Sequence, residues 1–129
     1  MINTNVYDYI NVLDKAADAS WLRNETIANN IANVDTPGYK RQDVAFEDQL
    51  RKAMGNSRYQ SMDDKVSSIK TSRLNAETYT DSPGYSYRMD GNNVDIDTEN
   101  VELASNQIKY NALIQSVNHE FTNLKSVMK

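Results

Sequence analysis

The sequence predicts a mainly α protein, in which a long N-terminal helix and a long C-terminal helix pair as a coiled coil. An irregular polar middle with one short helix and Pro-Gly turns is expected to join them. Nine of the Leu, Ile, Val and Phe residues lie in residues 1–34 and eleven in 94–129, whereas residues 55–90 hold only three. In both ends the apolar residues recur at alternating intervals of four and three, the spacing of a helical seam. We therefore expect an N-terminal axial helix (1–34), a turn and connector (35–93), and a C-terminal axial region (94–129).

The N-terminal helix is expected to begin after a cap at Thr4 and to end near Val34, because Pro37 follows and the residue before a proline disfavours helical geometry. Its seam contains one polar member, Asn24, which would fix the register of the pair. The seam positions are Val6, Ile10, Leu13, Ala17, Asn24, Ile27 and Ile31.

The C-terminal helix is expected to be capped by Asp97 or Thr98, after a short extended piece over Val94–Ile96. Val101, Ala104 and Ile108 form an adjacent row that widens its apolar side. The seam positions are Tyr110, Ile114, Val117, Phe121, Leu124 and Met128.

The middle of the chain offers one short helix, over residues 43–54. Asp43 is its predicted cap, and Gly55 is expected to end it. Between Gly55 and Ser82 no firm structure is predicted.

Two similar corners punctuate this middle region, Thr36-Pro37-Gly38-Tyr39 and Ser82-Pro83-Gly84-Tyr85. Proline suits the second position of a type II turn, and glycine suits the third, which needs a positive φ. We expect such a turn at both corners, with Gly38 and Gly84 in the left-handed region.

Composition excludes several classes of function. The chain has 129 residues, a formal net charge of −4 and no cysteine. A net negative charge argues against nucleic acid or an anionic membrane surface as the main partner. Without cysteine there is no disulfide and no thiolate nucleophile. No run of consecutive apolar residues exceeds three, so neither a transmembrane helix nor a cleavable Sec-type signal is expected.

Catalytic and metal chemistry has few candidates. His119 is the only histidine, and no second His or Cys completes a dyad with it. The acidic run Asp95-x-Asp97-x-Glu99 resembles the start of a calcium loop, but Asn100 stands where such a loop needs glycine. Helix capping explains these acids better. No catalytic residue, cofactor or metal site is predicted, and an enzyme is the least favoured class.

The apolar seams favour association. Two helices cover only part of each other's apolar surface, and exposed apolar stripes on long helices usually bind partner helices. Self-association or hetero-association is therefore expected over a stable monomer. A soluble helical adaptor or secretion chaperone acting as a small dimer is the alternative from another class.

The most specific stretch is Ile27-Ala28-Asn29-Asn30-Ile31-Ala32-Asn33-Val34-Asp35-Thr36-Pro37-Gly38-Tyr39-Lys40-Arg41. It resembles the signature of the bacterial flagellar rod and hook axial proteins, whose N-terminal helix ends in an Asn-rich turn and a Thr-Pro-Gly-Tyr corner. Within that group the chain is similar to the short proximal rod members, since it lacks a large β-rich insertion. The signature-turn residues are Asn29, Asn30, Asn33, Asp35, Thr36, Pro37, Gly38 and Tyr39.

This resemblance implies a structural subunit of the proximal rod of the flagellar basal body. Such a subunit polymerises through its terminal helices around the export channel and links the membrane ring and export gate to the rest of the rod. The implied partners are other rod proteins, FliE, the inner-membrane ring, the export gate and copies of the chain itself. The implied location is the basal body in the periplasmic space, reached through the flagellar type III system without a cleaved signal peptide. A different axial protein of the same group is the nearest alternative.

Overall fold

The computed structural model describes the backbone of residues 5–128 and the side chains of residues 7–128. The predicted cap at Thr4 and the side chain of Val6 lie outside the described residues.

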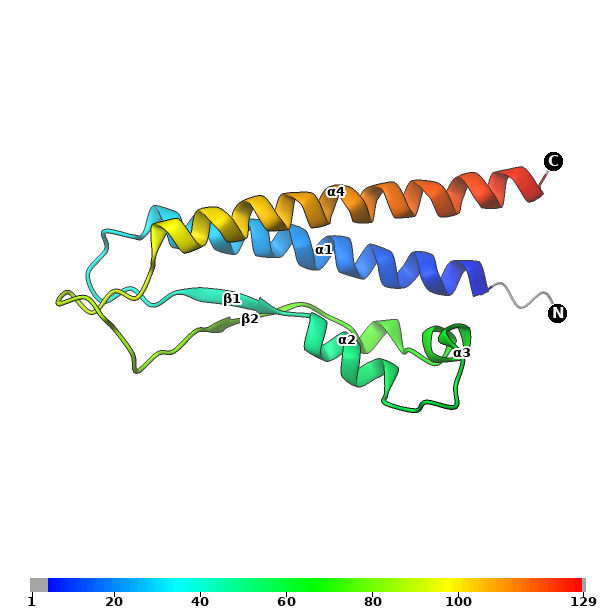
Figure 1. The fold of residues 1–129 in the computed structure, drawn as a ribbon, viewed down its shortest axis with the longest axis horizontal. Helices are drawn as coiled ribbons and strands as arrows, with labels where there is room; N and C mark the ends of the chain where they lie inside the picture. The colour runs from blue at the N-terminus through cyan, green and yellow to red at the C-terminus, as the bar shows by residue number, and fades with distance from the viewer. Residues whose placement is uncertain (1–4, 129) are drawn as a thin grey trace.

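Two long helices dominate the molecule. Helix α1 spans Asn5–Ala32 and helix α4 spans Ile96–Val127, which at 1.5 Å a residue gives lengths of roughly 42 and 48 Å. They lie side by side and run antiparallel, so that the start of α1 and the end of α4 share one end of the molecule (Figure 1). The prediction of two long helices in contact is confirmed. Among residues 5–128 no helix combines the length and the apolar character needed to cross a membrane.

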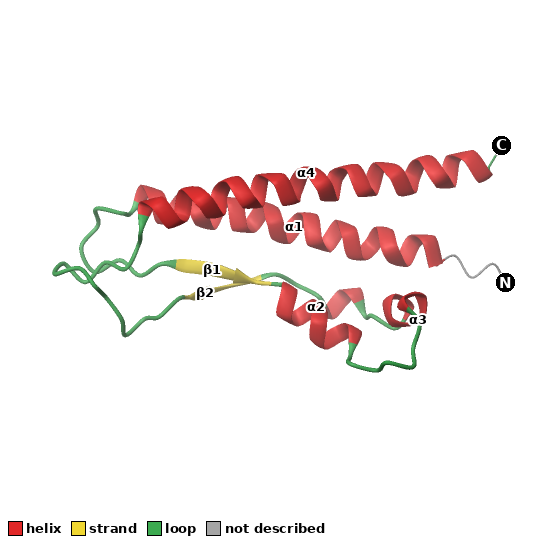
Figure 2. Cartoon of the chain, in the orientation of Figure 1, coloured by secondary structure: helices red, strands yellow, loops and turns green. Residues whose placement is uncertain are grey.

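The connector is more ordered than the sequence predicted. It contains strand β1 (Gln42–Ala45), helix α2 (Glu47–Met54), helix α3 (Met62–Ser67), a 3-10 turn (Thr71–Arg73) and strand β2 (Glu77–Thr80), as Figure 2 shows. Our expectation of no firm structure from Gly55 to Ser82 was wrong, because helix α3, the 3-10 turn and strand β2 form there.

The short predicted helix is also corrected at its start. Residues 42–45 form a strand, so Asp43 lies in β1 and is not a helix cap. The helix begins at Glu47 and ends at Met54, because Gly55 follows with a φ of 70°, which is not helical. Strand β1 pairs antiparallel with β2, with Gln42 opposite Thr80 and Ala45 opposite Glu77.

The apolar core lies between α1 and this connector rather than between the two long helices alone. Ala19 of α1 packs in one cluster with Phe46, Ile69 and Leu74, all buried. Val12 and Ala16 of α1, Leu50, Met54 and Ala76 complete it from partly buried positions. Burying a large apolar side chain contributes about 1.5–3 kcal/mol, so three such side chains fix the connector on α1. The middle of the chain is therefore a packed lobe and not a polar excursion.

Helix α4 begins earlier than predicted. Asp95 is its cap, and its side chain accepts a hydrogen bond from the backbone nitrogen of Asp97 at 3.0 Å. Ile96, expected in an extended piece, is already helical.

The second Pro-Gly corner departs from the expected turn. Tyr85 donates its backbone N–H to the carbonyl of Ser82 at 2.9 Å. The positive φ falls at Ser82 (44°), whereas Gly84 is not in the left-handed region, so the type II assignment there was wrong.

Candidate functional site

The signature residues form a corner at the end of α1. The side-chain amide of Asn33 donates to the carbonyl of Asn29 at 2.8 Å, and Thr36 donates its hydroxyl to the Asn33 side chain at 3.1 Å. The Asn29 carbonyl also accepts the backbone N–H of Asn33 at 3.1 Å, so the Asn33 amide adds a second donor to a carbonyl of the last helical turn. Tyr39 then donates its N–H to the Thr36 carbonyl at 3.3 Å across Pro37 and Gly38, whose φ is 72°.

A distant turn clamps this corner. Asn92 is fully buried, and its side-chain nitrogen lies 2.8 Å from the carbonyl oxygen of Asn33, 3.1 Å from that of Val34 and 2.9 Å from that of Thr36. One amide from residue 92 therefore caps the end of α1. Arg88 adds a second donor to the Val34 carbonyl at 2.6 Å.

The two turns also touch through their backbones. The N–H of Gly38 donates to the carbonyl of Asp90 at 2.8 Å. A Cβ on Gly91, whose φ is 81°, would lie 3.5 Å from the Cα of Gly38. Lys40 binds the Gly91 carbonyl at 2.5 Å. The corner is thus held in place by the turn at residues 88–92, which lies far from it in the sequence.

A buried polar network lies next to the corner. Asn30 and Glu99 have no exposed surface. Asn30 donates to the carbonyl of Gln42 at 2.7 Å and to Glu99 at 3.2 Å, and it accepts from the N–H of Gln42 at 3.0 Å and the hydroxyl of Tyr39 at 3.2 Å. This single amide joins α1, the corner, β1 and α4.

Arg41 provides the charge that balances Glu99. Its Nε donates to Glu99, and its Nη1 binds Asp43 at 3.2 Å and Asp81 at 3.1 Å. Burial is the largest single influence and disfavours the charged guanidinium, but the hydrogen bonds to Glu99 and Asp43 and the attraction of their charges together outweigh it and raise the pKa of Arg41. Removing either partner of such a buried pair leaves the other charge uncompensated, which strongly destabilises the folded state.

A second ion cluster ties both long helices to α2. Arg23 of α1 binds both carboxylate oxygens of Glu47, at 2.7 and 2.6 Å, and Lys109 of α4 binds the same carboxylate at 2.8 Å. The hydrogen bond from Arg23 is the main reason that the pKa of Glu47 falls to about 2.

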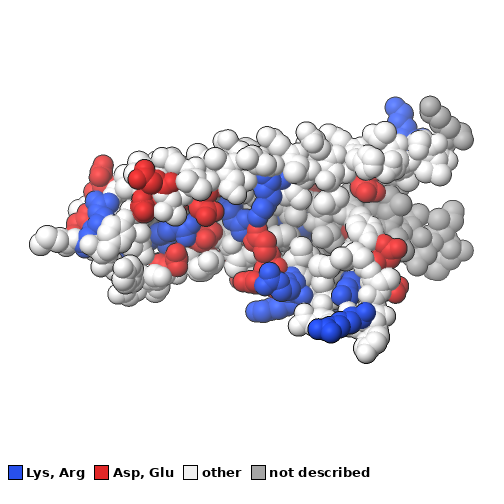
Figure 3. Space-filling model, viewed as in Figure 1, with Lys and Arg blue, Asp and Glu red and all other residues white. Residues whose placement is uncertain are grey.

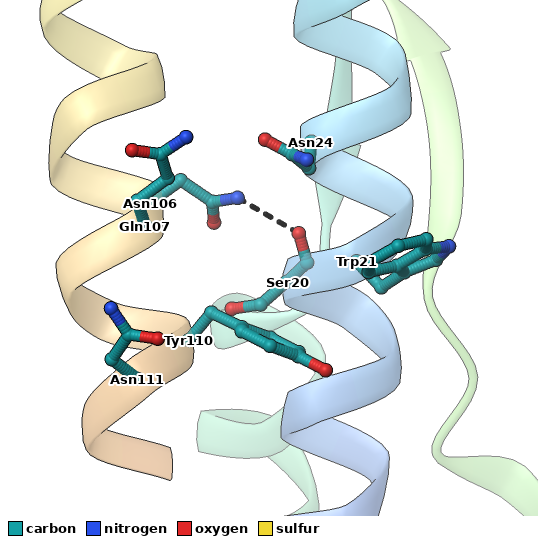
Figure 4. Close-up of a pocket in the computed structure, with 7 residues that line it drawn as sticks. All are labelled: Ser20, Trp21, Asn24, Asn106, Gln107, Tyr110 and Asn111. Carbon is teal, nitrogen blue, oxygen red and sulfur yellow. Dashed lines mark hydrogen bonds between the residues drawn. The ribbon is translucent and has the colours of Figure 1, made fainter. Parts of the chain in front are cut away.

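The contact between α1 and α4 centres on polar and aromatic side chains. Asn106 donates to the backbone carbonyl of Ser20 at 2.8 Å, and the rings of Trp21 and Tyr110 lie 6.2 Å apart at 51°. Figure 4 shows these residues around a cavity of about 240 Å³ that Asn24 also lines. The side-chain oxygens of Asn24 and Asn106 are buried there, and neither has a hydrogen-bond partner within the described chain.

The predicted α1 seam lies mostly inside. Ile10, Ala17 and Ile27 are buried. Leu13, Asn24 and Ile31 are partly buried.

The predicted α4 seam is divided between half-buried and exposed residues. Tyr110, Val117 and Leu124 are half-buried. Ile114, Phe121 and Met128 are exposed, Phe121 by 50%. The row that faces α1 has a different membership: Glu99, Leu103, Asn106, Tyr110, Leu113, Val117, Glu120 and Leu124. Whether the exposed members contact other subunits remains a prediction.

The signature turn is divided in the same way. Asn30 is buried, and Asn33 and Tyr39 are partly buried, because they bond within the corner. Asn29, Asp35, Thr36, Pro37 and Gly38 are exposed. The corner therefore presents one face to the chain and one to its surroundings.

Sequence reasoning missed several residues of this site. The sequence places Arg41 at the end of the signature stretch and Glu99 among the acids at a helix start, and neither position indicates that they form the central ion pair. Nothing near Asn92 in the sequence indicates that it caps a helix. Each partner lies more than fifty positions away, and no local pattern indicates such a pairing.

The described residues hold no cluster of three His, Cys, Asp or Glu side chains that could bind a metal ion. His119 is exposed on α4. The arrangement offers surfaces and fixed angles between elements, which is what a subunit of an assembly needs.

Comparison with known proteins agrees with that view. The profile of a family described as "Flagella basal body rod protein" matches residues 10–40. The chain is 37% identical to the flagellar basal body rod protein FlgB of Bacillus subtilis (strain 168), over 90% of this chain and 89% of that protein. It is 33% identical to FlgB of Borrelia hermsii, over 97% and 99%. It is 30% identical to FlgB of Escherichia coli (strain K12), over 83% of both chains.

Proposed function

Because this chain belongs to the FlgB family of flagellar basal body rod proteins, we propose that α1 and α4 build it into the rod by stacking beside the helices of other subunits around the export channel. The chain is a structural subunit of the proximal rod and not an enzyme. Its place is the flagellar basal body.

One observation carries this proposal: α4 exposes large apolar side chains along its whole length. Val101 and Ile108 are exposed on the side opposite the row that faces α1, and Phe121 is exposed beside that row, further along the helix. Val127 and Met128 extend the exposed apolar surface to its end. A long helix with an exposed apolar side favours a partner helix. Alternating intervals of four and three on both facing rows support coiled-coil geometry within the pair.

The corner at the end of α1 is also suited to assembly into the rod. Its clamped geometry sets the angle at which the chain leaves α1, so the lobe that carries α2 and α3 would be held at one orientation in every copy. Repeated identical contacts need such a fixed angle. We assign the exposed signature residues Asn29, Asp35, Thr36 and Pro37 to contacts with neighbouring subunits.

The partners follow from the family. We propose contacts with other rod proteins, with FliE and with the inner-membrane ring and export gate, together with export by the flagellar type III system without a cleaved signal peptide. The subunit would then lie in the periplasmic space and join the membrane ring to the rest of the rod.

Fractionation of detergent-extracted basal bodies tests this function. We expect the chain to co-purify with basal bodies and to be absent from those of a deletion strain. A matched pair of variants, Phe121→Asp on the exposed side of α4 and His119→Ala nearby, should separate incorporation from expression. A chain found only in the soluble fraction as a small dimer would support the adaptor or chaperone alternative instead.

A further inference from the structure

One area of the described surface, outside the corner and the helix contact, is strongly basic. Residues 51–73, which include the end of α2, all of α3 and the 3-10 turn, contain six basic and two acidic side chains. Among the described ion pairs only Arg51 of these six takes part, with Asp48 at 3.3 Å. In Figure 3 several of the Lys and Arg side chains lie along the lower edge of the molecule, where Figure 1 shows α2 and α3. We call this area the basic lobe: Arg51, Lys52, Arg58, Lys65, Lys70 and Arg73.

The basic lobe also carries exposed apolar side chains. Tyr59 is fully exposed beside Arg58, and Met62 is more than half exposed at the start of α3. Aromatic and arginine side chains together are the usual anchors of protein interfaces. The lobe thus combines charge with two anchors that nothing within the described chain covers.

An acidic surface of matching character lies on α1. Exposed residues recur along the helix at alternating intervals of four and three and so form a stripe on one side of it. The stripe holds three acidic residues and no basic one. None of those acids forms an ion pair within the described residues. Trp21, 56% exposed, lies between two of them. We call this row the acidic stripe: Tyr7, Asn11, Asp14, Asp18, Trp21, Glu25, Ala28 and Ala32.

The two surfaces lie on opposite sides of α1. The lobe packs on α1 through Val12, Ala16 and Ala19. Asp18 follows Ala16 by two positions, so at about 100° a residue the two side chains project about 200° apart around the helix axis. The lobe of a chain therefore cannot cover the acidic stripe of the same chain.

We infer that the basic lobe of one copy docks on the acidic stripe of a second copy. This inference rests on the proposed function, in which copies of the chain lie side by side. Opposite charges on opposite sides give a heterologous contact that each new copy can repeat. A two-fold contact through either surface would instead bring like charges together, which is costly. Tyr59 and Met62 of the lobe would pack near Trp21 of the stripe.

Charge reversal tests the inference. One variant carries Arg58→Glu, Lys70→Glu and Arg73→Glu on the lobe, which leaves three basic and five acidic side chains over residues 51–73. Another variant carries Asp14→Lys and Asp18→Lys on the stripe. We expect each variant to lower the amount of chain recovered in basal bodies about tenfold, because like charges then face each other. Glu77→Lys, exposed on β2 outside both surfaces, is the control and should not change recovery.

Two combinations identify the partner. When all five substitutions are in one chain, opposite charges face each other again, and recovery should return to within about twofold of the wild type. When the lobe variant and the stripe variant are expressed together, alternating copies are complementary and recovery should rise above that of either variant alone. Circular dichroism of the purified variants, with helix content equal to that of the wild type, shows that recovery reports docking and not misfolding.

Two results would overturn the inference. Single-surface variants with normal recovery would show that the surfaces are not in contact. Impaired single-surface variants that neither combination rescues would show that the lobe binds a partner other than this chain. Absence of the unchanged chain from basal bodies would contradict the proposed function itself, so the two failures are distinguishable.

Discussion

The two ends of the α1–α4 pair are held together by different forces. At the corner end, Asn30, Asn92 and Glu99 are fully buried and hydrogen-bonded. At the other end, beyond the bond from Asn106 to Ser20, no hydrogen bond joins the two helices among the described residues. There the pair relies on partly buried apolar contacts.

This difference indicates a division of labour. Polar networks depend on exact partner geometry, so the corner end specifies one arrangement and holds it without help. Apolar contact between helix ends is less specific, and isolated helices gain most of their stability from packing. We expect the corner end to be ordered in the single chain and the far end to become fully ordered only beside other subunits.

The largest expected effect comes from removing the buried charge of the corner. Glu99→Leu leaves Arg41 without its main partner, and we expect the free energy of unfolding to fall by about 3 kcal/mol, as for other broken buried pairs. Urea unfolding followed by circular dichroism measures this. Glu102→Leu, exposed on the same helix, is the matched control. A loss no greater than that of the control would show that the corner end is not the stable one.

Backbone strain in the corner should have a smaller effect. Gly38 has a φ of 72°, and no atom lies within 4 Å of the position its Cβ would take. Gly38→Val therefore introduces strain of about 1–3 kcal/mol without a clash. We expect impaired swimming with export largely intact, measured by a motility assay beside immunoblots of secreted protein. Gly84→Val, at a glycine without a positive φ, should be close to silent. Normal swimming of the Gly38 variant would contradict the turn.

The ion cluster of Glu47, midway between the two ends, should show in the pH dependence of stability. Its folded pKa of about 2 lies below the ordinary value of 4.5. The contribution of Glu47 is therefore present above about pH 4.5 and lost as the pH falls through about 2. Since its side chain is about half exposed, solvent screening reduces that contribution to about 1 kcal/mol. Urea unfolding of Glu47→Gln should differ from wild type at neutral pH and converge with it in acid, whereas Asp48→Asn should not differ at either pH.

Substitutions at the far end of the α1–α4 pair should change the stability of the isolated chain least. Phe121 is half exposed in the single chain, and we expect Phe121→Asp to change the free energy of unfolding by no more than about 0.5 kcal/mol while motility is lost. Val117→Asp, on the half-buried row, should lower both the free energy of unfolding and motility. Equal effects of the two substitutions on stability would mean that the faces of α4 are assigned wrongly.

The sequence predicted the long helices because periodicity and breakers are local signals. It did not predict which row of α4 meets α1, because the predicted seam and the observed row overlap and share Tyr110, Val117 and Leu124. Leu113 and Ile114 are adjacent, and their spacing from Tyr110 suits a helical seam equally well. The choice is made by contacts with α1, such as the bond of Asn106 to Ser20.

The connector was underestimated for a related reason. Strand β1 has four residues, and its partner β2 begins 35 positions later, so neither strand is recognisable without the other. Ile69 and Leu74 are too few to suggest a core from sequence, but Phe46 and Ala19 complete one across the fold. In the candidate site the exposed signature residues could be predicted by resemblance, whereas Arg41, Glu99 and Asn92 depend on pairing at long range.

The cap that Asn92 places on α1 has a kinetic consequence. The end of the first helix is completed by a residue 59 positions beyond Asn33, so a chain still emerging from the ribosome cannot finish α1 until residues 88–99 have been synthesised. Closing a loop of that length costs about 3–4 kcal/mol of chain entropy, and only the corner contacts repay it. We therefore expect loop closure at the corner to limit the folding rate. We also expect nascent chains arrested before residue 88 to have a frayed first helix.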